Sequence, residues 1–324
     1  MVVEFIDLKP SYVNEAIELV LSSYQDEKKS VPFLPHETQL LGDLKDKVLH
    51  LFHNGSGVLA IDNHKLVGFI AGYLINDSFF GKNKGVYVPL FGHGVSKRYK
   101  SSLYEELYKY SAGKWVKRSY TSHAITCFAH EHNTINNWFW LGFGLRGVDG
   151  LRRVQSIPYN NGSMIEIKKS TTDDIIQLAK LHREHNLYYR TSPIFMPNAE
   201  EDPVDDLIAW SMEENRHIWI AYKDKKPVGY MRIQPTAENF ISDHPEVMNI
   251  TGAYVFPDER GIGVGLKLIN EIQDWLKLKE YSLCGVDFEA FNTTGRSFWN
   301  KHFTPYTYSM VRRVDERITE IEFL

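Results

Sequence analysis

The spacing of apolar and polar positions predicts one series of elements that occurs twice along the chain. Residues 2–24 have the pattern of a short strand followed by a helix with apolar positions three or four apart, and residues 164–186 repeat it. A second helix is expected near 37–52 in the first half and near 203–215 in the second. Each half is therefore predicted to combine strands and helices in an α/β or α+β plan.

Two β-rich runs around a polar turn follow the helices in each half, a pattern typical of a strand hairpin. Three local sequence matches between the halves, at separations of 161, 167 and 159 residues, indicate a duplication. The matched pairs are Gly68 with Gly229, Val88 with Val255, and Asn133 with Asn292. The boundary is expected at 156–163, where Pro, Asn, Gly and Ser cluster, so the predicted domains are 1–158 and 163–324.

Three glycines lie between a predicted buried strand, 248–255, and a predicted helix. The apolar face of that helix is expected to consist of Ile262, Leu266, Ile269, Ile272 and Leu276. Gly261, Gly263 and Gly265 are a costly start for a helix, because glycine loses the most backbone freedom on folding. A helix N-terminus has unpaired N–H groups and a partial positive charge, and missing side chains would let phosphates reach those amides. Arg260 adds a cation, so the junction is predicted to bind a diphosphate.

Two better-known phosphate-binding motifs do not fit this junction. The pattern GxxxxGK[ST] does not occur in the chain, and the evenly spaced glycines do not meet the dinucleotide pattern GxGxxG. A nicotinamide-dependent oxidoreductase is therefore disfavoured. The remaining alternative is a glycine-rich turn that only lets a helix and a strand pack closely.

Residues 260–265, Arg-Gly-Ile-Gly-Val-Gly, resemble the [QR]-x-x-G-x-[GA] motif of the GNAT superfamily of acyltransferases. Residues 291–303 resemble the later Asn-containing helix of that family. The resemblance implies two tandem GNAT-like domains, each a mixed, mostly antiparallel sheet flanked by helices. Only the second half carries the full motif. After 86–95 no Arg-x-x-Gly-x-Gly follows, so the first domain is expected to be a degenerate copy.

The resemblance implies acetyl-CoA or another acyl-CoA as the donor, without a metal ion. Its pantetheine arm would pair with Tyr254 and Val255, and the Val255 N–H would polarise the thioester carbonyl. Asn292 would bind the arm or cap its own helix. Trp299 occupies the position of the tyrosine that commonly protonates the leaving thiolate, and it is expected to contact the donor. The diphosphate would lie on Arg260, Gly261, Ile262, Gly263, Val264 and Gly265.

Acyl transfer to an amine requires a base, because a free alkyl amine is protonated at neutral pH. Glu289 and Asp243 are the first candidates for the base. Trp299 cannot supply an acidic proton, so the acid is expected to be Tyr306, unless the thiolate leaves without a protein donor. The other tyrosine candidates are Tyr254 and Tyr308, and the other base candidates are His244, Glu246 and Asp287.

Composition excludes several further classes. A net charge of -4 and a pI near 6.4 argue against a nucleic-acid partner. No apolar run is long enough to span a membrane, and no signal peptide is visible. With two cysteines, the protein is expected to be cytoplasmic. The sequence predicts direct transfer of an acyl group to a small-molecule or peptide amine, with a non-catalytic acyl-CoA sensor as the alternative, and it indicates no oligomeric state.

Overall fold

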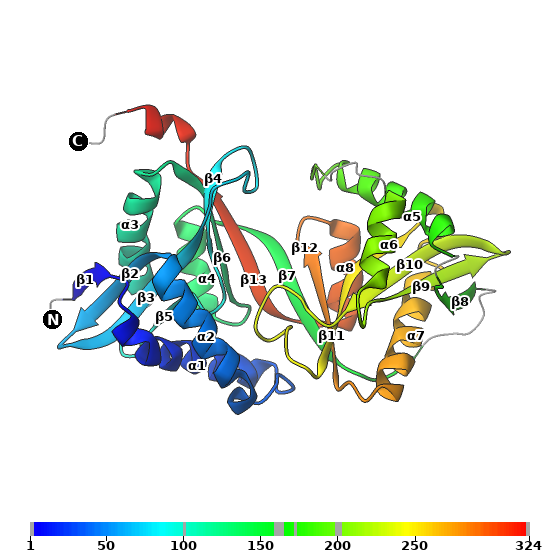
Figure 1. The fold of residues 1–324 in the computed structure, drawn as a ribbon, viewed down its shortest axis with the longest axis horizontal. Coiled ribbons are helices and arrows are strands. Elements are labelled where there is room, and N and C mark those ends of the chain that lie inside the picture. Colours follow the sequence, from blue (N-terminus) through cyan, green and yellow to red (C-terminus); the bar gives the residue numbers. More distant parts are fainter. Residues whose placement is uncertain (1–2, 100–101, 159–164, 172–173, 198–202, 322–324) are drawn as a thin grey trace. The chain divides into compact units, whose positions relative to one another are not determined.

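The computed structural model describes residues 3–99, 102–158, 165–171, 174–197 and 203–321. The chain divides into two compact units (Figure 1). The first consists of Met1–Val148 with Pro305–Leu324, and the second of Asp149–Thr304. Residues 159–163 of the predicted linker lie outside the described residues.

The first unit is a mixed sheet with helices. Its strands run in the order β1-β2-β3-β4-β6-β13, and β5 also pairs with β3. All these pairs are antiparallel except β4 with β6. The elements are β1 (Glu4–Asp7), η1 (Pro10–Tyr12), α1 (Val13–Ser30), α2 (Glu37–Asn54), β2 (Ser56–Asp62), β3 (Lys65–Ile75), β4 (Lys84–Val88), β5 (His93–Val95), α3 (Leu103–Val116), β6 (Tyr120–Phe128), α4 (His132–Trp140), β13 (Thr304–Arg313) and η4 (Glu316–Glu320).

The second unit repeats this plan, and β7 (Gly144–Arg153) carries the chain into it. Its strands run in the order β12-β11-β10-β9-β8, and only β11 with β12 is parallel. In Figure 1, α5 and α6 cover one face of this sheet and α7 covers the other. The elements are β8 (Ile165–Lys169), α5 (Ile175–Tyr189), α6 (Pro203–Met212), β9 (His217–Lys223), β10 (Lys226–Gln234), β11 (Val247–Val255), η3 (Pro257–Glu259), α7 (Val264–Leu278), β12 (Leu283–Glu289) and α8 (Thr293–His302). The predicted fold class, two tandem units of mostly antiparallel sheet and helix, is confirmed.

Helix α7 begins two residues later than its apolar pattern predicts. Ile262 is 45% exposed and lies in the loop before the helix. The face that packs on the sheet consists of Val264, Leu268, Ile269, Ile272 and Leu276, each fully or nearly fully buried. The loop is therefore longer than expected.

Strand register shows which positions of the two units correspond. Gly229 lies opposite Val255 on β11, and Gly68 lies opposite Val95 on β5. Val95, and not Val88, is thus the counterpart of Val255, and their separation of 160 residues agrees with the other two matches. The sequence match to Val88 is wrong because residues 89–92 form an irregular connection between β4 and β5.

The last strand belongs to the first unit, which differs from the predicted division of the chain. In β13, Thr307 lies opposite Phe128 and Arg313 lies opposite Ser122, so β13 is the antiparallel neighbour of β6. The described part of the predicted linker belongs to the second unit. The Ile157 N–H donates to Asn270 Oδ1 at 2.7 Å, and the Asn270 amide donates back to the Ile157 carbonyl.

Among the described residues, no helix has both the length and the apolar character needed to cross a membrane. The predicted cytoplasmic location stays a prediction.

Removal of β13 should unfold the edge of the first unit. A chain that ends at Phe303 leaves β6, which is buried along its whole length, without one of its neighbours. An exposed apolar strand edge exchanges freely and aggregates. We expect amide hydrogen exchange in Tyr120–Phe128 to accelerate about tenfold or more, measured by mass spectrometry. A chain that ends at Arg313 keeps β13 and should exchange like the full chain, and equal protection in both truncations would show that β13 is dispensable.

Candidate functional site

The second unit contains a cavity of about 560 Å³ where β11 separates from β12. The two strands pair only from Val247 with Leu283 to Ile250 with Val286. On the other side, β11 stays paired with β10 as far as Val255, but the register slips at Thr251, which has no partner. Such a bulge bends a strand and increases its twist. The last residues of β11 therefore have an edge that no strand of the described residues covers.

Backbone groups of β11 face this open edge. The Phe256 N–H donates to the Val228 carbonyl of β10 at 3.0 Å. Because the N–H groups of alternate residues face opposite sides of a strand, the N–H groups of Val255 and Ala253 face away from β10. The predicted oxyanion donor, Val255, is thus on the open edge, and Ala253 is a second amide of the same kind.

The open edge leads to the glycine-rich loop. Gly261 and Gly263 have left-handed backbone, with φ of +81° and +93°, and no atom lies within 4 Å of the place where a Cβ would stand. Gly265 differs, because a Cβ there would lie 3.0 Å from the ring of Phe298 on α8. Two glycines therefore shape an open turn, and the third lets α7 and α8 pack closely.

The start of α7 presents unpaired amides at this turn. The first bond of the helix runs from the Lys267 N–H to the Gly263 carbonyl at 3.0 Å. Among the described residues, no backbone carbonyl accepts a bond from the amides of Gly261 to Leu266. Together with the partial positive charge of a helix N-terminus, these amides form a site for an anion. The glycine positions and the exposed Ile262 leave this site open to solvent.

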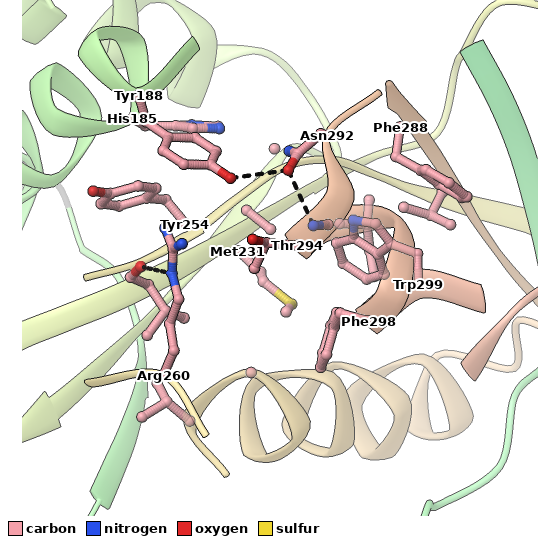
Figure 2. A pocket seen from close by; sticks show the side chains of 18 of the residues that line it. His185, Tyr188, Met231, Tyr254, Arg260, Phe288, Asn292, Thr294, Phe298 and Trp299 are labelled. Atoms are coloured by element: carbon pink, nitrogen blue, oxygen red, sulfur yellow. Dashed lines mark hydrogen bonds between the residues drawn. The ribbon is translucent and has the colours of Figure 1, made fainter. Parts of the chain in front are cut away.

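Arg260 connects the loop to β11 and α5. Its Nε donates to the Val255 carbonyl at 2.9 Å, and its guanidinium lies 4.9 Å from the ring centre of Tyr188 and 5.6 Å from that of Tyr254 (Figure 2). These contacts hold the guanidinium over two aromatic rings. Its predicted contact with a diphosphate stays a prediction.

Asn292 caps the N-terminus of α8, which confirms one of the two roles predicted for it. Its Oδ1 accepts from the Gly295 N–H at 3.1 Å and from the Tyr188 hydroxyl at 3.0 Å, so α5 and the start of α8 meet there (Figure 2). Its predicted contact with the arm of a donor stays a prediction. Trp299, on the same helix, lines the cavity and is 7% exposed.

The acid predicted from the sequence lies elsewhere. Tyr306 belongs to β13 of the first unit, is 1% exposed, and does not line the cavity. Tyr308 is on the same strand. This outcome follows from the pairing of β13 with β6, which local sequence patterns do not reveal. Of the predicted tyrosines, only Tyr254 lines the cavity, where its ring stacks on His185 at 5.3 Å.

The two carboxylates ranked first as bases are not in the cavity wall. Asp243 lies in the turn before β11, where it accepts from the Ala237 N–H at 3.2 Å. Glu289 is at the end of β12 but does not line the cavity. Of the carboxylates predicted as bases, Asp287, two residues earlier on the same strand, does line it. Although Asp287 is accessible to solvent, desolvation within the cleft, with the charges of Glu238 and Glu289, raises its pKa to about 7.

Helix α5 supplies residues that sequence reasoning missed. The Nδ1 atoms of His182 and His185 lie 3.1 and 2.8 Å from the hydroxyl of the buried Tyr230. A tyrosine has one hydroxyl proton, so one imidazole accepts and the other donates. Burial lowers the pKa of His185 to about 3, which keeps its ring neutral. The repeat of His and Tyr at 182, 185 and 189, spaced three and four apart on one helix face, was the available signal.

Among the described residues, no group of three or more His, Cys, Asp or Glu side chains is placed to hold a metal ion.

Comparisons with known proteins agree with this geometry. Residues 179–303 match the model of the acetyltransferase (GNAT) family. No curated protein matches the chain. A GCN5-related N-acetyltransferase from Sphaerobacter thermophilus is similar in structure, with a TM-score of 0.60 at 13% identity over 96% of this chain and 95% of that chain.

Two further solved structures are similar. A glucosamine N-acetyltransferase region of a fungal multi-domain GH3 β-N-acetylglucosaminidase matches with a TM-score of 0.55 at 11% identity, over 96% of this chain and 38% of that chain. A tandem GNAT protein from the clavulanic acid biosynthesis pathway matches with a TM-score of 0.45 at 13% identity, over 96% of this chain and 98% of that chain. At these identities the likeness concerns the fold.

Proposed function

Because residues 179–303 belong to the GNAT acetyltransferase family, in a chain that folds as two GNAT-like units in tandem, we propose that the second unit transfers an acetyl or other small acyl group from acyl-CoA to an amine. One observation carries the proposal. The uncovered edge of β11 leads directly to unpaired amides at a glycine-rich helix start. A donor with a peptide-like arm and a diphosphate matches both features at once.

The residues of the second unit fit such a donor. Because glycine has no side chain, the space beside Gly261 and Gly263 is open and available to phosphate oxygens. A side chain of any other residue would fill it. Val255 and Ala253 can bond to the amides of the arm as an added strand would. Ala253 is the better oxyanion donor, because it is nearer to the bulge at Thr251, beside which Asp287 stands. This choice places the oxyanion donor two residues before the predicted Val255.

Asp287 is the proposed base. With a pKa near 7, its carboxylate can take the proton of the attacking amine at neutral pH. The nitrogen attacks the thioester carbonyl carbon as it gives this proton to Asp287, and the carbon–sulfur bond breaks to release the thiolate. The described cavity wall contains neither cysteine nor serine, which supports direct transfer within a ternary complex.

Tyr188 is the proposed proton donor to the departing thiolate. It comes from α5 and so takes over the task of the family's tyrosine, whose position on α8 holds Trp299. Its hydroxyl lies at the first turn of α8, bonded to Asn292, and the Arg260 guanidinium lies over its ring.

The first unit is proposed to bind no donor. The loop that follows Val95, the counterpart of Val255, has the sequence Ser-Lys-Arg-Tyr-Lys-Ser-Ser and no glycine. At the position that corresponds to Ala253, the first unit has His93, which is 4% exposed. The His93 Nε2 lies 2.8 Å from the Thr126 carbonyl on β6 and so bridges the gap between β5 and β6. The space that is open in the second unit is filled here.

Calorimetry with acetyl-CoA tests the donor site, and release of free thiol with a panel of amines tests the transfer. We expect one acetyl-CoA per chain. Gly263→Asn should weaken binding about tenfold or more, because asparagine tolerates left-handed backbone but places a side chain among the phosphates. Gly113→Ala in α3, where a Cβ meets no atom, is the control.

Failure of the wild type to bind, or equal affinity of Gly263→Asn, would contradict the donor site. Saturable binding without transfer to any amine would favour the alternative, a non-catalytic sensor.

Replacement of Asp287 tests the base. Wild-type kcat/KM should fall as pH drops through about 7, because the active carboxylate becomes protonated. Asp287→Asn should lower kcat/KM roughly 100-fold at pH 8 and remove that limb of the profile. Asp243→Asn, in the turn outside the cavity, should stay within about twofold of wild type. A wild-type pH profile in Asp287→Asn would rule the residue out.

Replacement of Tyr188 tests the acid. Tyr188→Phe keeps the ring beside Arg260 but has no proton to give, so kcat should fall about tenfold or more. The Kd for acetyl-CoA should change little, which separates proton donation from a structural role. Tyr281→Phe, whose ring stacks on Trp275 outside the cavity, is the matched control. An unchanged kcat, or equal losses in kcat and affinity, would contradict the assignment.

A further inference from the structure

Arg232 is a cation in the cavity wall that donor binding does not use. It is half-buried on β10 and lines the cavity near the bulge of β11, away from the diphosphate site at the start of α7. Among the described residues, no carboxylate lies within ion-pair distance of its guanidinium. Its polar contacts are long bonds of 3.3 and 3.4 Å to one acceptor, the Thr251 carbonyl. A partly desolvated guanidinium with so few partners has unused donors.

Gly252 determines where this side chain lies. It is the cross-strand partner of Arg232, and a Cβ at Gly252 would lie 2.6 Å from Arg232 Nε and 3.1 Å from its Cδ and Cγ. The arginine therefore lies flat across β11, over the missing side chain. Its bond to the Thr251 carbonyl places the guanidinium at the bulge, where β11 and β12 separate.

Asp287 stands on the other side of that separation. Pairing of β11 with β12 ends at Ile250 and Val286, so Asp287 is the first β12 residue beyond it. The positive charge of Arg232 acts on Asp287, yet the two groups are not in ion-pair contact. Arg232 and Asp287 have opposite charges, line the same cavity and do not contact each other. The space between them suits a ligand that has one positive and one negative group.

Aromatic packing holds the guanidinium in place. Arg232 lies 5.1 Å from the ring centre of Trp210, and Arg216 lies 5.4 Å from the same ring. The Trp210 Nε1 donates to Gln234 at 3.0 Å, which sets the ring orientation. Only Arg216 has a carboxylate partner, Glu213 at 2.6 Å. A stacked guanidinium presents a planar set of donors that matches a carboxylate with two parallel bonds.

We propose that the acceptor is an amino acid, an amine that carries a carboxylate a few bonds away, with the carboxylate bound by Arg232 and the amine facing Asp287. The proposal rests on the acyltransferase function proposed above. Arg232 acts as a specificity-determining residue, and the negative charges of Asp287, Glu238 and Glu289 attract the ammonium end.

The test compares matched acceptors at saturating acetyl-CoA. The probes are α-amino acids and β-alanine, the carboxamide and the decarboxylated amine of each, and the corresponding aminoalkylphosphonates. We expect kcat/KM for the best amino acid to exceed that of its carboxamide by about 10- to 100-fold, as loss of a charged hydrogen bond predicts. Preference for a phosphonate would overturn the choice of a carboxylate.

Arg232→Gln should raise KM for the amino acid about 10- to 100-fold, leave KM for the carboxamide and the Kd for acetyl-CoA nearly unchanged, and so remove the preference. Arg232→Lys should restore part of it. Arg216→Gln, which removes the second guanidinium packed on Trp210, is the matched control and should behave as wild type. An equal change for all acceptors would show a structural role and overturn the proposal.

Different results would contradict the amino-acid acceptor and the acyltransferase function. Transfer to plain amines without any preference for a carboxylate overturns the amino-acid acceptor and leaves the acyltransferase in place. Absence of acetyl-CoA binding overturns the function itself, and the acceptor with it.

Discussion

The interruption of pairing between β11 and β12 is the constraint on which the site depends. Backbone N–H and C=O groups are normally paired, and leaving them without partners inside a protein is costly. Here the bulge at Thr251 turns the end of β11 away from β12, and the loop before α7 adds further unpaired amides. The unit keeps these groups accessible to solvent or a ligand. A strand edge and a helix start thus form one continuous surface of accessible backbone groups.

The first unit shows the same fold without this opening. It has the same order of elements, and its parallel pair β4 and β6 ends at Val88 and Ile125 as β11 and β12 end at Ile250 and Val286. Beyond that point the imidazole of His93 fills the gap, and Tyr104 and Trp138 pack around it. The two units therefore share a scaffold and differ in what occupies this gap: His93 in the first unit, and part of the cavity wall in the second.

Local patterns predicted much of the fold and the loop, because helix spacing, hairpin turns and glycine clusters are encoded by neighbouring residues. Asn292 was recognised as a cap for the same reason. Tyr306 was misplaced because the choice of partner for a terminal strand depends on the whole sheet. Val88 was matched to Val255 in error. The irregular segment at 89–92 separates β4 from β5, so the residue that corresponds to Val255 lies further along the chain, at Val95.

The choice between Glu289 and Asp287 shows a second limit of sequence reasoning. Both lie on β12 and point to the same face, and only the extent of the β11 pairing shows that Asp287 is the one beside the opening. Arg232 and Tyr188 were likewise invisible, since their importance comes from elements distant in sequence that pack against them. Residues whose role depends on the strand register or on helix packing need a structure to be found.

The charge state of Asp287 connects function with stability. An aspartate in an unfolded chain has a pKa of about 3.9, whereas the cleft and its neighbouring carboxylates raise the folded value to about 7. Between those values the folded state keeps a proton that the unfolded state has released, so stability falls as pH rises across this range. The folded protein is thus less stable at neutral pH than it would be with a neutral residue there. The same desolvation that lowers stability brings the pKa of this carboxyl group into the range where it can accept a proton from an amine. The proposed base role therefore accounts for an acidic residue at this position despite its cost in stability.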